Sequence, residues 1–154
     1  MPASPDIRLA ESKDIIGLME LLLSFHDDCW FGTTSTNENK ILEYIERVMD
    51  AGLVVVGVVR DIKEAEHIVA SIAVAPQQPW WSDDWFMHDR WFFVNQGYRS
   101  MNIARALVSL ARSYAKSCEM PLLLMDISGV DVARKPALYR RLGMTLIGGN
   151  YVEK

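Results

Sequence analysis

The sequence has only two cysteines in 154 residues, and it has no apolar run long enough to cross a membrane. Cys29 and Cys118 lie far apart and neither belongs to a CxxC pair, so neither a disulfide framework nor a zinc site is expected. No three potential metal ligands have a binding spacing, and the first residues lack the basic segment and apolar core of a signal peptide. We therefore predict a cytoplasmic protein with no metal and no membrane partner.

The sequence also lacks a surplus of positive charge. Its 16 Lys and Arg residues face 20 Asp and Glu residues, which gives a net charge of −4. Because nucleic-acid binding depends on an excess of cations facing phosphates, no nucleic-acid partner is expected. Half of the residues are hydrophobic and 23% are charged, as in globular proteins. Since no repeat, linker or low-complexity segment interrupts the chain, residues 1–154 are expected to form a single domain.

Hydrophobic patterns along the chain predict both strands and helices. Strands are expected at residues 7–9, 53–60, 67–74, 85–94, 121–127 and 144–152. Helices are expected after Ser12, between Ser35 and Gly52, over 100–117 and over 135–142, with Ser35 and Glu38 in the form of a capping box. This order predicts an α/β arrangement of the mixed α+β kind, with a central, mostly antiparallel twisted sheet of six to seven strands and about four helices.

The strongest functional signal lies where the strand that ends at Val94 gives way to the helix that carries Leu107. The polar turn between them contains Arg99, and Arg105 follows in the helix. The first turn of a helix has N–H groups without internal partners and lies at the positive end of the peptide dipoles. This segment is therefore expected to hold a phosphate or pyrophosphate group.

Two motifs in this part of the chain point to a family. The residues Arg99-Ser100-Met101-Asn102-Ile103-Ala104 resemble the acetyl-CoA motif R/Q-x-x-G-x-G/A of the GNAT superfamily of N-acetyltransferases. Asn102 stands where glycine is usual, and Asn is among the residues that best tolerate positive φ. The stretch 137–144 is similar to the family's tyrosine-bearing helix and Y-x-x-L-G-F turn, with Met144 in place of phenylalanine. Two motifs in the right order are more specific than either alone.

The resemblance implies a GNAT-like fold, with two parallel strands that splay apart at the CoA site, and acetyl-CoA as the co-substrate. It implies that the backbone of Phe92 and Val94 bonds the pantetheine arm and that helix N–H groups hold the pyrophosphate. It also implies that Tyr139 protonates or hydrogen-bonds the departing CoA thiolate. The cofactor-binding residues expected on this basis are Phe92, Val94, Arg99, Ser100, Met101, Asn102, Ile103, Ala104 and Arg105.

Acetylation of an amine also needs a base, because an alkyl ammonium has a pKa of roughly 10 and only the neutral amine is nucleophilic. Arg90 occupies the position where GNAT relatives frequently carry a glutamate four residues before the valine that ends the strand. Asp89 is our candidate catalytic base, and a β-bulge can turn either Asp89 or His88 toward the site. Two alternatives remain: these side chains are solvated loop charges, or water takes the proton.

Acidic and aromatic residues occur together in two loops that are expected to flank the acetyl group. Asp27 and Trp30 lie in the first loop, and Asp83 and Asp84 lie among three further tryptophans in the second. Together they predict an anionic, aromatic mouth for a cationic amine. The alternatives are that these tryptophans cover a loop or form a homodimer interface. Arg90 is also a substrate-binding candidate, since it can recruit a carboxylate or phosphate on the substrate.

The combined prediction is an acetyl-CoA-dependent N-acetyltransferase that moves the acetyl group directly to a primary amine of a small molecule or peptide. The rival prediction is a non-catalytic domain of GNAT fold that binds acyl-CoA or serves in interactions. Asn102 and Arg90, which depart from the family pattern, motivate the rival.

Overall fold

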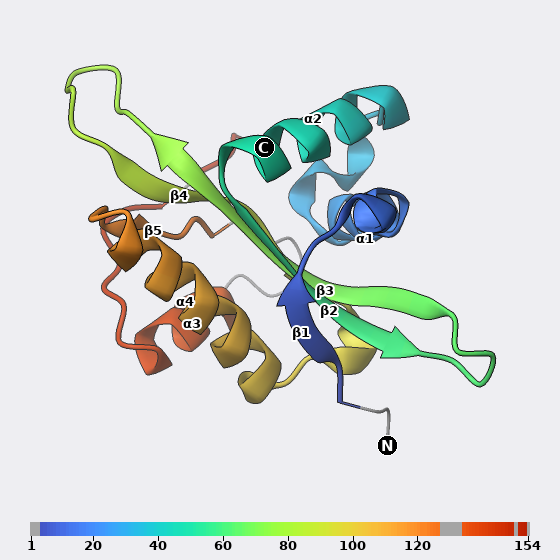
Figure 1. Cartoon of the computed structure of the whole chain (residues 1–154). Helices are drawn as coiled ribbons and strands as arrows, with labels where there is room; N and C mark the ends of the chain where they lie inside the picture. The colour runs from blue at the N-terminus through green and yellow to red at the C-terminus, as the bar shows by residue number, and fades with distance from the viewer. Residues whose placement is uncertain (1–3, 127–133, 150, 154) are drawn as a thin grey trace.

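The computed structural model describes residues 4–126, 134–149 and 151–153 and contains one five-stranded sheet with the strand order β1-β2-β3-β4-β5 (Figure 1). Neighbouring strands are antiparallel except for the parallel β4–β5 pair. The elements in chain order are β1 (Asp6–Leu9), η1 (Ser12–Asp14), α1 (Ile15–Asp28), η2 (Trp30–Thr33), α2 (Glu38–Ala51), β2 (Leu53–Arg60), β3 (Glu66–Gln77), β4 (Phe86–Val94), η3 (Gln96–Tyr98), α3 (Met101–Ser117), β5 (Leu122–Leu123) and α4 (Arg134–Arg141). None of the helices in these ranges is long and apolar enough to span a membrane.

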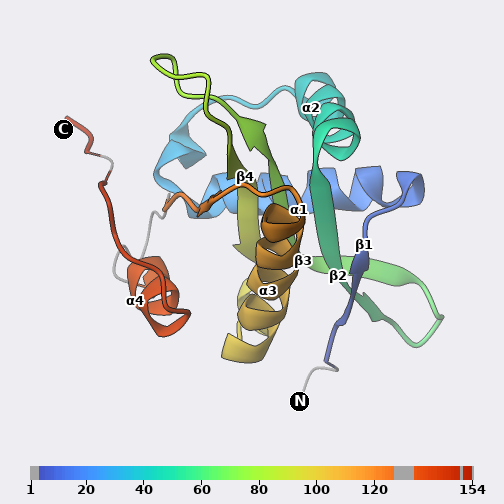
Figure 2. The same ribbon diagram turned by 60° about the vertical axis from the view of Figure 1, so that its left-hand side comes forward.

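The sheet lies between two layers of helices, and each face carries its own apolar cluster (Figures 1 and 2). Side chains on a strand alternate between faces, so Val54 and Val56 of β2 pack with α1 and α2 while Val55 packs with α3. Trp91 of β4 belongs to the α1 side and Phe92 to the α3 side. This burial on both faces accounts for the near-continuous apolar runs of β2 and of the middle of β3.

The last predicted strand is wrong. Residues 144–149 and 151–153 contain no strand, so the described sheet has five strands rather than six or seven. Leu146 and Ile147 are 73% and 80% exposed, and Gly148 and Gly149, which follow them, disfavour a strand. The end of the predicted strand at 121–127 falls outside the described residues, and β5 itself is only two residues long. Because β5 has only two residues, it offers few backbone groups with which a following segment could form strand hydrogen bonds.

Side-chain caps begin α2 and α3, and the cap that the sequence predicted for α2 is wrong. The capping box expected at Ser35 and Glu38 is wrong, because Asn37 caps α2 by accepting a hydrogen bond from Lys40 N. Ser100 caps α3 by accepting a hydrogen bond from Ile103 N at 3.2 Å. Gly143 follows α4 with φ +79°, a conformation that other residues rarely adopt, and this ends the helix where the sequence predicted.

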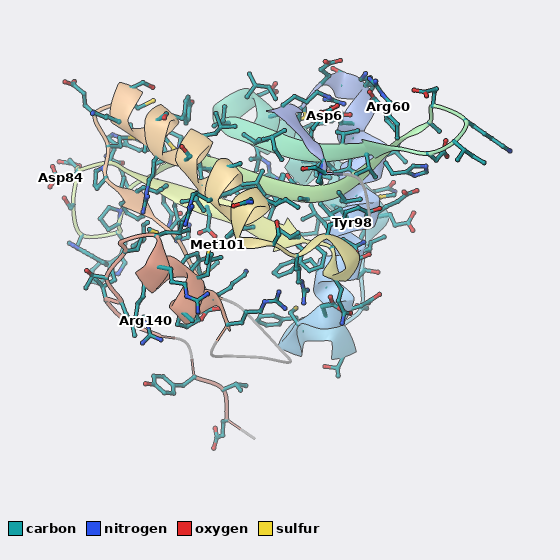
Figure 3. The ribbon with its side chains drawn as sticks, turned by 90° about the horizontal axis from the view of Figure 1, so that it is seen from below. Asp6, Arg60, Asp84, Tyr98, Met101 and Arg140 are labelled. Carbon is teal, nitrogen blue, oxygen red and sulfur yellow. The ribbon has the colours of Figure 1, made fainter. Side chains whose placement is uncertain are left out.

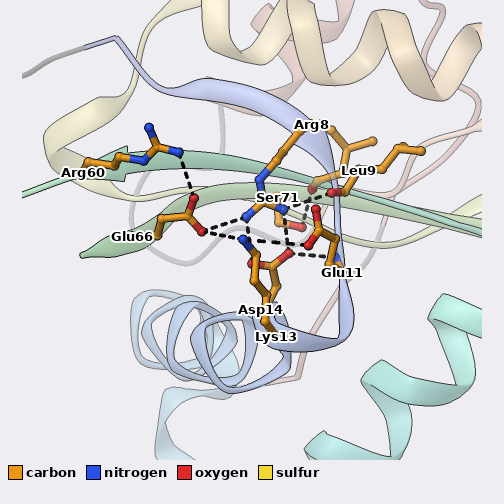
Figure 4. Close-up of polar contacts among 9 residues, drawn as sticks. Arg8, Leu9, Glu11, Lys13, Asp14, Arg60, Glu66 and Ser71 are labelled. Atoms are coloured by element: carbon orange, nitrogen blue, oxygen red, sulfur yellow. Dashed lines mark hydrogen bonds and ion pairs between the residues drawn. The ribbon is translucent and has the colours of Figure 1, made fainter. Parts of the chain in front are cut away.

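A charged network holds the N-terminal strand against the start of α1 (Figure 4). Arg8 of β1 donates two hydrogen bonds to the buried Asp14 carboxylate, at 2.7 and 2.9 Å, and a third to Glu66 of β3. Asp14 also accepts from Glu11 N, while Lys13 pairs with Glu66. The hydrogen bonds from Arg8 hold the pKa of Asp14 below its ordinary value. The Asp14 carboxylate therefore links β1 to the start of α1, and Arg8 extends the network to Glu66 of β3.

We expect Asp14→Asn to lower the free energy of unfolding by about 2 kcal/mol near neutral pH, because Arg8 loses a charged acceptor. The contribution of a carboxylate with a depressed pKa is complete above its unfolded pKa of about 4 and is lost as pH falls through its folded pKa. Urea unfolding should therefore show that the variant and the parent converge at low pH. Lys13→Gln, at an exposed position of the same network, should change stability by less than about 0.5 kcal/mol. An equal loss of unfolding free energy in Asp14→Asn at neutral pH and at low pH would contradict this assignment.

Candidate active site

The free edge of β4 is the central feature of the site. β4 pairs with β5 only at Met87–Leu122 and His88–Leu123, in the parallel direction that the sequence predicted. Beyond these two pairs, β4 continues to Val94 without a described strand beside this edge. The structure thus contains the parallel strand pair expected from the family resemblance.

Two cationic side chains donate hydrogen bonds to backbone carbonyls along this edge. Lys135 Nζ of α4 donates to Phe92 O at 3.0 Å, and Arg99 Nε donates to Val94 O at 2.9 Å. Arg99 also pairs with Asp28 at the end of α1, at 3.3 Å, and its guanidinium carbon lies 5.6 Å from the Phe93 ring centroid. The two carbonyls assigned to the pantetheine arm therefore already accept hydrogen bonds from the chain itself.

A β-bulge interrupts the pairing of β3 with β4. Ala73 faces Trp91 and the next residue, Val74, faces Asp89, so Arg90 is the extra residue in β4. Arg90 donates to the Gln77 side chain at 2.9 Å and to a β3 carbonyl at 3.3 Å. Its guanidinium is thus held along β3.

Asp89 lies inside the protein, with only 4% of its surface exposed. Its carboxylate accepts a hydrogen bond from Met125 N at 2.8 Å, across the gap between β4 and the segment after β5. Burial raises the pKa of this carboxyl, while the Met125 amide and the nearby His88 and Lys135 oppose the rise. Asp89 therefore ties the two diverging segments together, and it does not line the cavity described below.

His88 lines the cavity described below, as do two further basic side chains, Arg112 and Arg140. Its Nδ1 lies 2.6 Å from the Asp89 carbonyl oxygen, and a carbonyl can only accept a hydrogen bond, so Nδ1 carries the proton. In the neutral imidazole this leaves Nε2 as the acceptor. The sequence singled out Asp89 and its neighbour His88, and only the structure shows that the half-buried imidazole of His88 lines the cavity while Asp89 does not.

Tyr139 of α4 is buried and stacks on Phe92, with ring centroids 6.3 Å apart. Its hydroxyl donates to Met125 O at 3.2 Å. Burial raises the pKa of Tyr139, with Asp89 and Asp126 acting in the same direction, so the phenol stays protonated at neutral pH. The Tyr139 hydroxyl can therefore donate a hydrogen bond but does not act as a base at neutral pH.

A cavity of about 580 Å³ lies between β5, α4 and the C-terminal segment, large enough for a small-molecule group. His88 and Tyr139 both line it, together with residues 122–126 and 144–149. No group of three potential metal ligands occurs among the described residues.

The N-terminus of α3 follows the far end of β4, and Figure 3 labels Met101 there. Ser100 accepts from Ile103 N, and its carbonyl accepts from Ala104 N, while the first-turn amides of Met101 and Asn102 have no earlier helical carbonyl to pair with. Asn102 is exposed and does not have a positive φ. Arg105 is exposed on the following turn.

The acidic residues do not form one mouth, contrary to the prediction. Asp83 and Asp84 are exposed in the loop that precedes β4, whereas Asp28 pairs with Arg99 beyond the other end of the strand. A nine-residue strand separates the two groups by roughly 25 Å. Asp27 pairs with its neighbour His26, and the side chain of Trp30 lies outside the described part of the structure.

The tryptophans of the second loop remain exposed, at 92% for Trp80, 70% for Trp81 and 50% for Trp85. The first two form an edge-to-face pair with centroids 5.3 Å apart. They and the two aspartates belong to the β3–β4 loop, at the end of β4 that is nearer to His88, and Figure 3 labels Asp84 there. We call residues 78–85 the tryptophan loop.

Comparison with known proteins fits this geometry. No curated protein matched the sequence. Three solved structures share the fold: glucosamine-6-phosphate N-acetyltransferase from Arabidopsis thaliana (18% identity, TM-score 0.68, 97% of each chain), an aminoglycoside 6'-N-acetyltransferase from Acinetobacter haemolyticus (16%, 0.66, 97% of each) and an acetyltransferase from Trypanosoma brucei (16%, 0.69, 97% of this chain and 98% of that one). The model of the acetyltransferase (GNAT) family matches residues 17–144. The chain therefore belongs to the GNAT family of acetyl-CoA-dependent N-acetyltransferases.

Proposed function

We propose that this chain transfers the acetyl group of acetyl-CoA directly to a primary amine, and that residues 1–154 act as one domain. The observation that carries the proposal is the open edge of β4. This edge leads from the N-terminus of α3, past Val94 and Phe92, toward the cavity that His88 and Tyr139 line. The proposed acetyl-CoA site therefore runs from the N-terminus of α3 along β4 to the cavity with its proposed base and proton donor.

The residues along this track suit acetyl-CoA. The first-turn amides of α3 and the nearby Arg99 and Arg105 match a pyrophosphate in charge and hydrogen bonding. The carbonyls of Phe92 and Val94 match the amide N–H groups of a pantetheine arm. Asn102 needs no glycine-like conformation, because it lies in regular helix, and its side chain can donate to a phosphate oxygen.

His88 is proposed as the general base. Its Nδ1–H is held by the Asp89 carbonyl, so Nε2 can take a proton from the acceptor's ammonium group, directly or through a bridging water, and the neutral amine then attacks. The Asp89 carboxylate serves to position this segment, through its bond to Met125 N. This replaces Asp89 as the base that the sequence favoured.

Tyr139 is proposed as the donor to the departing thiolate. Its hydroxyl keeps its proton at neutral pH, and the residue lines the cavity in which the thioester is proposed to lie. A cysteine nucleophile has no support in this geometry. Cys29 is buried with its thiol on His26 O, Cys118 lies at the end of α3, and neither residue lines the cavity.

The proposed acceptor is a cationic amine, either a small molecule or a basic peptide. Asp83 and Asp84 provide negative charge beside the exposed tryptophans of the same loop, and an ammonium group is attracted both to carboxylates and to indole faces. Two relatives of the same fold are an aminoglycoside acetyltransferase and a glucosamine-6-phosphate acetyltransferase. Arg90, held by Gln77, is a second candidate contact for an acceptor that carries its own anionic group.

Calorimetry with acetyl-CoA, followed by measurement of CoA release over a panel of amines and peptides, tests the function directly. Micromolar binding with release in the presence of at least one primary amine is the expected result. Binding without turnover on any amine would favour the non-catalytic acyl-CoA-binding alternative. Absence of binding would exclude both.

We expect His88→Ala to lower kcat/KM about 100-fold or more, because the positioned base is lost. Added imidazole should restore part of the rate in this variant, a result that a merely structural role of His88 would not produce. His67→Ala, at an exposed strand position far from the cavity, is the matched control and should retain full activity. Retained activity in His88→Ala would point to water as the base, and loss of activity without imidazole rescue would point to a structural role of His88.

Asp89 should behave as a positioning residue. Asp89→Asn keeps an acceptor for Met125 N and should cost less than 100-fold in kcat/KM, whereas Asp89→Ala leaves that buried amide unpaired and should destabilise the fold by about 2 kcal/mol. Because burial raises the pKa of Asp89, the charged carboxylate costs stability as pH rises from about 4 through its folded pKa. Urea unfolding should therefore show that Asp89→Asn becomes more stable relative to the parent as the pH is increased from about 4 through the folded pKa of Asp89.

The tryptophan loop is expected to contribute to acceptor binding and not to acetyl-CoA binding. Asp83→Asn combined with Asp84→Asn should raise KM for a cationic amine several-fold while kcat and acetyl-CoA affinity change little, as when a ground-state contact is lost. Asp50→Asn, on α2, is a control for net charge. A preferred acceptor that is anionic, or an unchanged KM, would shift the assignment to Arg90.

A further inference from the structure

The side chain of Lys135 enters the gap between β4 and the segment that follows β5. Lys135 and Tyr139 lie four residues apart on α4 and therefore share one face of the helix. The Lys135 amine donates to Phe92 O and lies 5.4 Å from the Phe25 ring centroid and 5.6 Å from that of Phe92. The site described above assigns no role to this amine.

We propose that the Lys135 amine is itself an acetyl acceptor, which the chain acetylates in cis from its own bound acetyl-CoA. This inference rests on the proposed function, because it needs an acetyl-CoA arm that lies along β4. It adds a modification site to the enzyme and a product that competes with acetyl-CoA for the same edge.

The position of Lys135 brings the amine to the acyl end of the arm. An arm that starts at the N-terminus of α3 meets Val94 first and Phe92 second, so its thioester lies near or beyond Phe92. When the arm takes the Phe92 carbonyl, the amine has to leave it. The lysine stem is long and rotatable, and stacking of Tyr139 on Phe92 keeps α4 in place. The displaced amine therefore stays beside the thioester.

The surroundings of the amine favour its neutral, nucleophilic form. Burial lowers the pKa of Lys135, against the opposing effect of Asp89 and Asp126. Asp89 is close enough to interact with the amine electrostatically, and its own buried carboxylate has a raised pKa, which suits it to accept a proton.

The chemistry balances without any further reactant. The amine lone pair forms a C–N bond to the thioester carbonyl carbon, and the C–S bond breaks to release CoA thiolate. The proton lost by the nitrogen passes through solvent to the thiolate, so that CoA leaves as the thiol. The products are an N-acetyl lysine and free CoA.

The acetylated side chain would hold the edge of β4 closed. It carries no charge, so its burial costs less than that of an ammonium group. Its amide N–H can still donate to Phe92 O, and the acetyl methyl group lies among the Phe25 and Phe92 rings. Acetyl-CoA would then have to displace a neutral, well-packed group, and the modified enzyme should bind it about tenfold more weakly.

The test is incubation of the full chain with acetyl-CoA and no acceptor amine, followed by intact mass measurement and peptide mapping. The expected result is a single acetyl group at Lys135, formed at a fractional rate that does not change with protein concentration. Lys135→Arg should remain unmodified and should lose the progressive decline in turnover that the parent shows after preincubation with acetyl-CoA. Lys116→Arg, at an exposed site on α3, is the matched control and should behave like the parent.

The outcomes separate this inference from the proposed function. Binding of acetyl-CoA and turnover on an external amine, with Lys135 unmodified, would overturn the self-acetylation alone. Acetylation spread over exposed lysines at similar rates, or a fractional rate proportional to protein concentration, would overturn it as well. Absence of acetyl-CoA binding would overturn both. Peptide mapping of the unmutated chain supports or overturns the inference even if the Lys135 variant fails to fold.

Discussion

The site depends on one constraint, which is that two parallel strands part after two residue pairs. Once β4 leaves β5, the backbone groups of Phe92 and Val94 need other partners, because unpaired polar groups in a protein interior are costly. In this structure Lys135 and Arg99 donate to them. The same backbone groups suit a ligand that runs like an added strand, so the break in the sheet supplies the binding edge.

Two hydrogen bonds to the Met125 backbone connect β4 and α4 to the segment that follows β5. Its amide donates to the Asp89 carboxylate, and its carbonyl accepts from the Tyr139 hydroxyl, so β4, the segment after β5 and α4 meet at one residue. These bonds are partly buried, and breaking either one would remove a partner from a polar group. They also fix the Asp89 backbone carbonyl, which sets the tautomer of His88. Structural support and proposed proton transfer are thus connected through the same short segment.

The two ends of β4 serve different chemistry. Cations and helix amides gather beyond Val94, where Arg99 is balanced by Asp28, while carboxylates and tryptophans gather before Phe86. This separation suits a reaction that joins an anionic donor to a cationic acceptor, since each enters at the end with opposite charge. The β-bulge at Arg90 lies between the two ends.

The sequence by itself determined the order of the elements as far as α4, the polar turn before α3 and the family, because these depend on local periodicity, caps and residue motifs. The tertiary structure alone decided which side chains meet. His88 and Asp89 are adjacent in sequence, and only strand alternation and the bulge direct one to the cavity and the other to Met125. The contact between Lys135 and Phe92 joins residues 43 positions apart, and the sequence contains no local signal for it. The separation of Asp28 from Asp83 likewise follows from the length of β4, which no composition reveals.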